Sequence, residues 1–425
     1  DISRNNSEKA DLAKVPLDIT VSKNAVLEQE NKKELNLTKP AEIKVTVNGR
    51  EEVWTVEAAW ANNTVLPGEY ADPDIDVLDG KFYIYPTTDG FSGWSGTQFH
   101  AFSSEDMINW VDEGVIVDVA SNDTVAGTNE NGVDIAGVPW AVGSAWAPTI
   151  EEKNGSYYFY FCAKESNGKS AIGVAVSDSP NGPFVAEETP LVTMELCSQN
   201  GVSMGQTIDP SIFTDPDTGK SYMLFGNGSA AIVELGEDMI SLVPDTMQNL
   251  EGAKDFREAI TVTKRDGVYH FTWSCDDTGS ANYHVNYGTS DSLYGPITFQ
   301  KTILSKDASE SILGTGHHSI LQIPGKDEYY IAYHRFATPL GQYDSGLGYH
   351  RETCIDKLEF DPETGLMKEV TPTQAGITEP VSLIVEGWEP DGDRWSYVNP
   401  DGSYVVNDWK LIDGKWYHFD KSGYM

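Results

Sequence analysis

Short aromatic-rich runs that follow a turn recur along this chain and form its clearest pattern. They read DGKFYIY (79–85), NGSYYFYF (154–161), TGKSYMLFG (218–226), DGVYHFTW (266–273) and KDEYYIAYH (326–334). A turn followed by aromatic and β-branched residues is typical of a β-strand. Successive runs start 75, 64, 48 and 60 residues apart. The spacing predicts five structural units, each larger than the repeat of a short solenoid.

A second strand-like segment follows four of these runs and ends in a turn rich in Ser, Asp and Gly. These segments are FHAFSSEDMINW (99–110), AIGVAVSDSPNGPF (171–184), AAIVELGEDMISL (230–242) and HVNYGTSDSLYGPI (284–297). In the fifth unit GYHRETCIDKLEF (348–360) takes the equivalent place. Five units of several strands, with few helix signals, predict an all-β chain built as a five-bladed β-propeller.

A third segment lies seven to nine residues before each aromatic run and carries a polar or aromatic residue. The segments are ADPDI with Asp72, WAPTI with Trp146, IDPSIF with Asp209, REAITV with Glu258, and GHHSIL with His317 and His318. In a propeller the first strand of each blade lines the central channel. We therefore expect these side chains to meet on one axis, although they span about 245 residues of chain.

The two ends of the chain follow other patterns. Residues 1–60 contain PAEIKVTVNGREEVWTVEA, with an Asn48–Gly49 hairpin turn, and are interpreted as a small β-rich segment, the remnant of an Ig-like sandwich domain. Residues 386–425 repeat with a period of 21, which pairs Trp388 with Trp409 and Trp395 with Trp416. Exposed Trp and Tyr residues stack on sugars or hold choline-like cations. The predicted domains are thus 1–60, 61–385 and 386–425, the last being a wall- or glycan-binding tract or a stabilising tail.

Charge and composition narrow the classes of partner. The 425 residues carry 29 Lys+Arg against 66 Asp+Glu, a formal net charge of −37. Nucleic acid and anionic lipid would be repelled, so a neutral polymer is the expected partner. No apolar run approaches the roughly 18–20 residues of a membrane-spanning helix. The four cysteines, Cys162, Cys197, Cys275 and Cys354, are widely spaced and are expected to be buried free thiols.

Three carboxylates that converge from different blades suit glycoside hydrolysis. One carboxylic acid protonates the leaving oxygen and one carboxylate activates water. A third carboxylate beside the acid would raise its pKa by repulsion. Asp72, Asp209 and Glu258 are the candidates, with Trp146 as a face for a sugar ring. An Asp before Pro is by itself a common turn element. A catalytic site is favoured because the candidate residues keep a similar distance from the aromatic run in all five units.

In order along the chain, these segments resemble glycoside hydrolase family 43, inverting five-bladed propellers that act mostly on arabinose- and xylose-containing polymers. The resemblance covers residues 65–378. It rests on VLPGEYADPDI, SAWAPTIEEKNGSYYFYF, TIDPSIFTDPDTGKSY, FREAITVTKRDGVYHFTWS, GTGHHSI and GYHRETCIDKLEF.

The resemblance implies a role for each matched residue. Asp72 falls on the general base, Glu258 on the general acid and Asp209 on the residue that modulates the pKa of the acid. Arg351 falls on an arginine that binds substrate next to the modulator. His317 falls on an axial histidine that faces a calcium ion in many members, and no organic cofactor is expected. An inverting site needs roughly 6.5–9.5 Å between base and acid.

Substrate and location are also implied by resemblance. Many members have Glu-Gly-Pro at the acid where this chain has Glu258-Ala259-Ile260, which is similar to arabinofuranosidase-type branches. An α-L-arabinofuranosidase is therefore favoured, acting on plant-derived or microbial glycans. The segment WKLIDGKWYHF resembles the choline-binding-like, cell-wall-binding repeats of Gram-positive surface proteins. It implies a secreted or surface-associated protein.

Other interpretations stay open. The same fold serves β-xylosidases, β-galactofuranosidases or galactosidases, and endo-arabinanases, and loops 116–145 and 185–206 would shape the pocket. Trp140 and Trp94 are candidate walls of a closed pocket that favours exo-action. Outside enzymes, a non-catalytic glycan-binding surface module and a calcium-dependent structural protein are the alternatives.

The segment GEYADPDIDVLDG raises a question of its own. In a regular strand Asp72, Asp74 and Asp76 share one face, whereas Asp79 belongs to the following turn. Three close carboxylates cannot all be charged without partners. Either Pro73 bends the strand so that Asp74 leaves that face, or the carboxylates meet cations or backbone amides.

Overall fold

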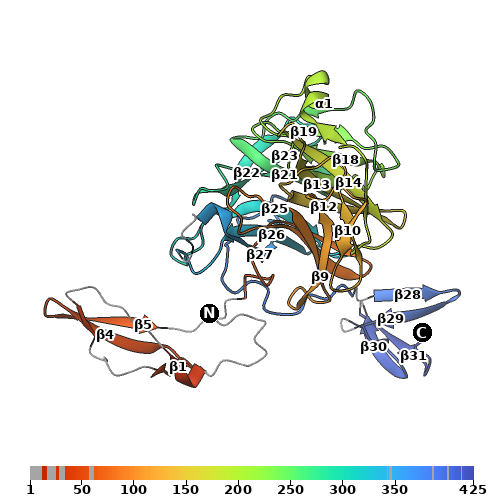
Figure 1. Cartoon of the computed structure of the whole chain (residues 1–425). Helices are drawn as coiled ribbons and strands as arrows, with labels where there is room; N and C mark the ends of the chain where they lie inside the picture. Colours follow the sequence, from red (N-terminus) through yellow and green to blue (C-terminus); the bar gives the residue numbers. More distant parts are fainter. Residues whose placement is uncertain are drawn as a thin grey trace.

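The fold is that of a five-bladed β-propeller with additional small sheets from the two ends of the chain (Figure 1). It is taken from a computed structural model that describes residues 12–16, 25–27, 34–56, 62–341, 343, 347–384, 387–399, 402–412 and 414–425. The all-β prediction is confirmed, because helix within these ranges is limited to α1 (Met194–Gln199) and the short 3₁₀ turns Leu12–Lys14 and Leu347–Tyr349.

The first three or four strands of each blade pair antiparallel in sequence order. Blade 1 holds β6 (Tyr70–Leu78), β7 (Lys81–Thr88), β8 (Gln98–Ser104) and β9 (Trp110–Asp118), extended by β11 (Asp134–Gly137), which pairs with β9 in parallel, and by β10 (Val125–Thr128). Blade 2 holds β12 (Trp146–Lys153), β13 (Ser156–Lys164), β14 (Ser170–Ser177) and β15 (Val185–Ala186), with β16 (Val192–Thr193) also on β14.

The remaining blades follow the same order. Blade 3 holds β17 (Ser211–Thr214), β18 (Ser221–Phe225), β19 (Ala231–Glu234) and β20 (Gln248–Asn249). Blade 4 holds β21 (Phe256–Arg265), β22 (Val268–Cys275), β23 (His284–Ser290) and β24 (Thr298–Leu304). Blade 5 holds β25 (Gly316–Gln322), β26 (Tyr329–Phe336) and β27 (Arg351–Leu358). The five aromatic runs are thus the second strands of the five blades.

The first strands β6, β12, β17, β21 and β25 stand side by side around the axis, and β25 contacts β6 to close the ring. Closure is reinforced by the chain before blade 1, where the Val65 amide donates to the Thr353 carbonyl of β27. The Asn63 side chain also donates to Asp356 and accepts the Ile355 amide. The segment before blade 1 is therefore hydrogen-bonded to blade 5.

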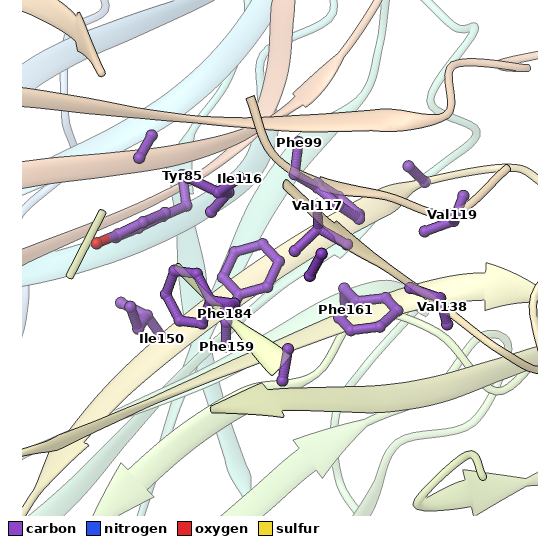
Figure 2. Packing of buried hydrophobic residues seen from close by; sticks show 14 of the residues in the cluster. Tyr85, Phe99, Ile116, Val117, Val119, Val138, Ile150, Phe159, Phe161 and Phe184 are labelled. Carbon is purple, nitrogen blue, oxygen red and sulfur yellow. The ribbon is translucent and has the colours of Figure 1, made fainter. Parts of the chain in front are cut away.

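Hydrophobic cores fill the spaces between neighbouring blades. Phe82 and Ile84 of β7 point into the cluster shared with blade 5, whereas Tyr83 and Tyr85 point into the cluster shared with blade 2. This alternation explains why β7 is apolar on both faces from Phe82 to Tyr85, since both faces are covered. Figure 2 shows the cluster between blades 1 and 2, in which Phe159 meets Phe99 edge-on at 5.3 Å between ring centroids.

The terminal sheets are small. Strands β2 (Ala25–Leu27), β4 (Ala41–Val47) and β5 (Arg50–Val56) form one sheet with the predicted hairpin turn at Asn48–Gly49, and β1 (Val15–Pro16) pairs with β3 (Glu34–Leu35). Residues 1–11, 17–24, 28–33 and 57–60 of the predicted segment lie outside the described residues. At the other end β28 (Gly387–Asp391) pairs with β29 (Arg394–Val398), and β30 (Asp408–Ile412) with β31 (Lys415–Phe419).

The two C-terminal hairpins pack on each other through Trp388. Its ring meets Tyr397 of its own hairpin at 5.2 Å and Tyr417 of the next hairpin at 4.8 Å. Trp409 and Trp416 remain 59% and 64% exposed, which leaves an aromatic surface available for a ligand. No helix in the described part of the chain is long and apolar enough to cross a membrane.

The inter-blade packing predicts a large cost for Phe159→Ala. The ring is fully buried among Phe99, Phe184 and Tyr85, so its removal leaves a cavity that the rigid sheets cannot fill. We expect the free energy of unfolding to fall by about 3–5 kcal/mol, measured by urea denaturation. Val111→Ala, at a side chain that is 58% exposed, is the control and should change it by less than about 0.5 kcal/mol. A loss at Phe159 no larger than in this control would contradict the packing argument.

Candidate active site

Every blade begins with one residue in the left-handed backbone region. These residues are Asp72 (φ 49°), Ala147 (φ 43°), Asp209 (φ 59°), Ala259 (φ 55°) and His317 (φ 38°). In four blades the pairing of first and second strands shifts register here, as in a β-bulge. Bulges re-aim side chains next to active sites. Strand alternation alone would point these side chains in different directions. Because of the bulge, they all reach one end of the channel.

The pocket at this end is lined by residues from all five blades and encloses about 140 Å³. Seven of the predicted residues contribute to it, namely Asp72, Trp94, Trp146, Asp209, Glu258, His317 and Arg351. The predicted convergence on one axis is therefore seen in the structure. The left-handed position itself is held by Asp72, Asp209 and His317, whereas Trp146 and Glu258 precede it by one residue.

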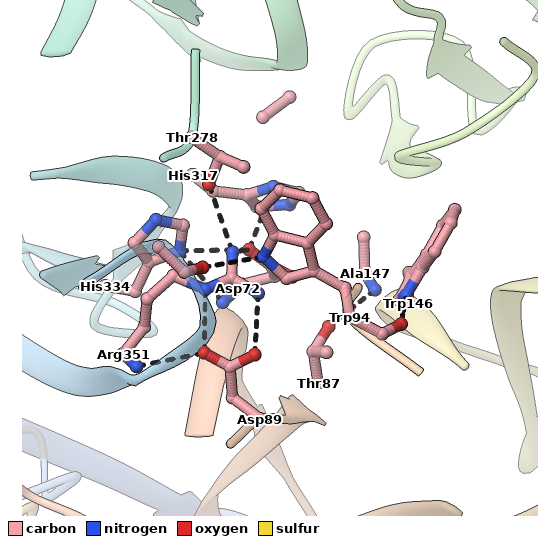
Figure 3. A network of polar contacts seen from close by, with 12 residues as sticks. Asp72, Thr87, Asp89, Trp94, Trp146, Ala147, Thr278, His317, His334 and Arg351 are labelled. Carbon is pink, nitrogen blue, oxygen red and sulfur yellow. Dashed lines mark hydrogen bonds and ion pairs between the residues drawn. The ribbon is translucent and has the colours of Figure 1, made fainter. Parts of the chain in front are cut away.

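Asp72 is surrounded by cationic and imidazole groups (Figure 3). Its Oδ1 lies 3.0 Å from Nη1 of Arg351, 2.9 Å from Nδ1 of His334 and 3.3 Å from Nδ1 of His317. Burial opposes ionisation, but the charge of Arg351, helped by the two imidazoles, holds the pKa of Asp72 well below its usual value. Asp72 is therefore a carboxylate throughout the neutral range.

Arg351 is held in place by Asp89. The Arg351 Nε and Nη2 atoms donate to the two carboxylate oxygens of Asp89 at 2.8 and 3.1 Å, and the Arg351 backbone amide donates to Asp89 as well. Such a bidentate pair fixes the plane of the guanidinium. The remaining Nη1 points at Asp72 and at Oγ1 of Thr278. The arginine is thus fixed beside Asp72, and its charge also lowers the pKa of Asp209, the residue beside which the resemblance places it.

Glu258 and Asp209 form the opposite side of the site. Tyr283 and Asn227 donate to the two oxygens of Glu258 at 2.9 and 2.8 Å. Burial raises the pKa of Glu258, and burial followed by the charges of Glu258 and Asp72 raises the pKa of Asp209 well above its usual value. The two groups therefore keep a proton under conditions in which Asp72 has lost its own.

His317 does not have the neighbours that a calcium site needs. Its nearest charged groups are Asp72 and Asp209, at 3.3 and 3.8 Å from Nδ1. Calcium takes six to eight oxygen ligands, and the described ranges contain no group of three or more His, Cys, Asp or Glu side chains that would hold a metal ion. The residues present do not fit a calcium ion held by protein side chains, and we assign it no step.

Two tryptophans form the aromatic wall. The Trp146 indole donates to the Trp94 carbonyl, and the Trp94 indole donates to the Gly348 carbonyl, both at 2.6 Å (Figure 3). Trp140 is placed elsewhere, stacked on Phe161 at 6.0 Å and 7° against the core between blades 1 and 2. The structure thus brings Trp94 and Trp146 into the pocket but leaves Trp140 outside its lining.

The other aspartates of the first strand are not pocket residues. After the bulge at Asp72, the Oδ2 of Asp74 accepts the Ile150 amide of blade 2 at 2.9 Å, and Asp76 accepts the Val77 amide. Burial raises the pKa of Asp74 to about 6 and that of Asp76 well above its usual value. Both expected arrangements therefore occur. The bulge turns Asp74 away from the face that carries Asp72, and the carboxylates of Asp74 and Asp76 accept hydrogen bonds from backbone amides.

Several site residues have no signal in the sequence. Asp89, Asn227, Tyr283 and His334 contact Arg351, Glu258 or Asp72 from second strands or the loops after them. For Asp89, Asn227 and His334 the available signal is their place at the end of an aromatic run, as in YPTTDG and YIAYHR. None of the four side chains is part of the pocket lining, and each contacts a lining residue.

The charge arrangement predicts that Asp209→Asn stabilises the protein. The folded-state pKa of Asp209 is raised, so its contribution to stability is complete below the ordinary carboxyl pKa and is lost as pH rises toward the folded value. Removing the charge should raise Tm, with a gain that grows from pH 4 to pH 8 in scanning calorimetry. Asp361→Asn is the control, because amide hydrogen bonds lower the pKa of this exposed turn residue and no gain is expected. A gain independent of pH would contradict the assignment.

Comparisons with known proteins agree with this geometry. The model for glycosyl hydrolases family 43 matches residues 61–364, and the model for the cell wall binding repeat matches residues 407–425. The β-D-galactofuranosidase xynD of Aspergillus niger is 34% identical over 348 residues, which cover 77% of this chain and 87% of that protein.

Solved structures show the same likeness. An α-L-arabinofuranosidase from Clostridium thermocellum is 30% identical with a TM-score of 0.56, over 73% of this chain and 96% of that one. A β-xylosidase/α-arabinofuranosidase from a compost metagenome, described as a calcium-free form with xylotriose, is 25% identical with a TM-score of 0.57, over 78% and 99%. With a family match across most of its length and a propeller that brings the matched residues together, the chain belongs to glycoside hydrolase family 43 and carries a C-terminal cell wall binding repeat.

Proposed function

We propose that the protein is an inverting glycosidase that removes α-L-arabinofuranosyl residues from glycan side chains. The observation that carries this proposal is the opposite ionisation of buried carboxylates across one pocket. The charge of Arg351 holds the pKa of Asp72 low against the effect of burial, whereas burial raises the pKa values of Glu258 and Asp209. A base and an acid with pKa values pushed apart are what glycoside hydrolysis at neutral pH requires.

In the proposed reaction Asp72 is the general base. Its carboxylate removes a proton from a water molecule that attacks the anomeric carbon. Arg351 keeps Asp72 ionised, and since Asp89 fixes the guanidinium, the base is also held in orientation. The Nη1 of Arg351 that also contacts Thr278 faces the pocket, where it is placed to meet a sugar hydroxyl.

Glu258 is the proposed general acid and Asp209 its modulator. Glu258 gives its proton to the departing glycosidic oxygen while Tyr283 and Asn227 keep its carboxyl group oriented. Asp209 and Glu258 repel each other when both are charged, so a charged Asp209 favours the protonated form of Glu258 until the leaving group takes the proton. Asp209 also accepts the Ala259 amide at 3.1 Å and so holds the backbone beside the acid.

The pocket favours release of a single terminal sugar. Its volume of about 140 Å³ is well below the roughly 300–1,000 Å³ of sites for larger ligands. Trp94 and Trp146 offer ring faces beside the three carboxylates. The arabinofuranosidase relative supports a five-membered sugar ring, which agrees with the Glu258-Ala259-Ile260 sequence at the acid.

A β-D-galactofuranosidase is the second candidate function. The relative from Aspergillus niger, 34% identical over most of both chains, carries that activity in its name. Galactofuranose is also a five-membered ring sugar, so the same base, acid and aromatic wall would serve it. The two functions differ in the exocyclic group that the pocket must admit.

The proposed division of the chain is 1–60, 61–385 and 386–425. The cell wall binding repeat indicates surface association. We propose that the exposed Trp409 and Trp416 of the last segment attach a secreted enzyme to the wall of a Gram-positive cell, while the propeller cuts plant-derived or microbial glycans. The net charge of −37 suits a neutral sugar polymer rather than a polyanion.

The proposed substrate is tested with a panel of 4-nitrophenyl glycosides. The α-L-arabinofuranoside should be cleaved with a higher kcat/KM than the β-D-galactofuranoside and the β-D-xyloside. Proton NMR during the first turnovers should show a product of inverted anomeric configuration. Asp72→Asn should lose at least about 100-fold in rate. Preference for another glycoside would replace the substrate, whereas retention of configuration would refute the mechanism.

The acid role is tested by leaving-group dependence. Glu258→Ala should lower kcat on an arabino-oligosaccharide by about 10²–10⁴-fold, because the sugar alkoxide needs a proton to leave. A 2,4-dinitrophenyl glycoside needs no such proton and should lose far less. Glu195→Ala, on an exposed side chain of α1 outside the pocket, is the matched control and should leave both rates unchanged. Equal losses on the two substrates would place the acid elsewhere.

A further inference from the structure

The left-handed residue that opens each blade is held by a hydrogen bond from the blade before it. The Ala147 amide donates to Oγ1 of Thr87 at 2.8 Å, and the Asp209 amide donates to Sγ of Cys162 at 3.0 Å. These bonds cross from the second strand of one blade to the first strand of the next. They satisfy amides that the bulge removes from the strand ladder.

The same contact recurs around the ring. The His317 amide donates to Oγ of Ser274 at 2.9 Å, and the Asp72 amide lies 3.2 Å from Nδ1 of His334. The last of these joins blade 5 to blade 1 and so completes the circle. Together with the two contacts above, three of the left-handed amides donate to a hydroxyl or thiol of the preceding blade, and a fourth lies beside Nδ1 of His334, the atom that also pairs with Oδ1 of Asp72.

The four acceptor residues occupy one structural position. Each is paired across the sheet with the residue that precedes the left-handed residue of its own blade. The pairs are Thr87 with Ala71, Cys162 with Trp146, Ser274 with Glu258 and His334 with Gly316. We call this position the tether position. It is occupied by a hydroxyl, a thiol and a hydroxyl, each able to accept a hydrogen bond, and in blade 5 by the imidazole of His334.

Blade 3 has no hydrogen-bond acceptor side chain at the tether position. There the residue opposite Ile208 is Gly226, whose amide donates to the Ile208 carbonyl. Glycine has no side chain to hold the next blade, and the Ala259 amide is held instead by Oδ2 of Asp209 at 3.1 Å. The fifth tether is therefore supplied by a residue of the pocket itself.

These contacts form a relay behind the acid. Cys162 holds the amide of Asp209, and the side chain of Asp209 holds the amide of Ala259, the residue after Glu258. Cys162 is fully buried and is absent from the pocket lining. Burial raises the pKa of its thiol well above the usual value, so the sulfur stays protonated and neutral.

We propose that Cys162 is a positioning residue for the Asp209–Glu258 pair, acting through the Asp209 amide that its sulfur holds. A left-handed conformation at a residue other than glycine is strained and persists only where the surroundings enforce it. Without the acceptor, Asp209 relaxes toward ordinary strand geometry, and its carboxylate moves relative to both Ala259 and Glu258. The expected effect on glycoside cleavage rests on the proposed function, whereas the expected effect on the Asp209 backbone does not.

The experiment compares Cys162→Ala, which removes the acceptor, with Cys162→Ser, which keeps one. In Cys162→Ala, kcat/KM on the arabinofuranoside should fall about 3- to 10-fold, the scale of one lost hydrogen bond. The limb of the pH profile that reports the protonated acid should shift, and Cys162→Ser should restore both. Thr87→Val removes the equivalent tether of Ala147, which carries no titratable group. This control should leave the pH limbs in place.

Amide hydrogen exchange gives a readout that needs no activity. Exchange at Asp209 should be faster in Cys162→Ala than in wild type or Cys162→Ser, while exchange at Ala147 responds only to Thr87→Val. If the wild-type protein cleaves no glycoside, the proposed function fails and the exchange data still decide the positioning role. If the wild type is active and Cys162→Ala leaves both the Asp209 exchange and the pH profile unchanged, the inference is overturned. A change in Tm alone, without those two shifts, likewise refutes it.

Discussion

The active site depends on a backbone conformation that the chain would not adopt unaided. Five residues at the heads of the first strands have positive φ, and none of them is glycine. Asp and His accept this region more readily than Ala does, yet all five blades share it. The cost, of order 1–3 kcal/mol per residue, is offset by hydrogen bonds from the preceding blade and by the inter-blade cores. The propeller is thus a frame that holds five strained residues in register.

Charge is organised on that frame by position. Three carboxylates are buried in one pocket of a protein with a net charge of −37, and their arginine partners differ. Asp72 lies 3.0 Å from the buried guanidinium of Arg351, whereas Glu258 lies 3.7 Å from Nε of Arg257, whose side chain is 43% exposed. The pKa of Asp72 is lowered, while burial raises the pKa values of Asp209 and Glu258. Asp89 matters for the same reason, since it neutralises part of the Arg351 charge and fixes its direction. The contrast in pKa between neighbouring carboxylates depends on where the Arg351 guanidinium is held.

The blades repeat the same backbone arrangement, but the residues at equivalent positions differ and have different roles in the site. The tether position is equivalent in every blade, but its occupant differs, and where Gly226 leaves it empty Asp209 takes over. Every blade needs an acceptor for the amide of its left-handed residue. In blade 4 that acceptor is the carboxylate of Asp209, which also interacts electrostatically with Glu258. This links the stability of the ring to the electrostatics of the pocket and explains why Asp209 is buried at a cost to stability.

The sequence by itself determined the five units, their all-β character and the residues that open them. Those conclusions rest on local patterns: aromatic runs such as SYYFYF are buried on both faces, and the entry segments keep a constant offset from them. It did not decide between Asp72 and Asp74, because strand alternation puts both on one face and only the bulge separates them. Nor did it place Trp140 in the core, Arg351 beside Asp72, or Asp89 and Tyr283 in the site. Arg351 and Asp89 lie 262 positions apart in the chain, and only closure of the ring brings them together.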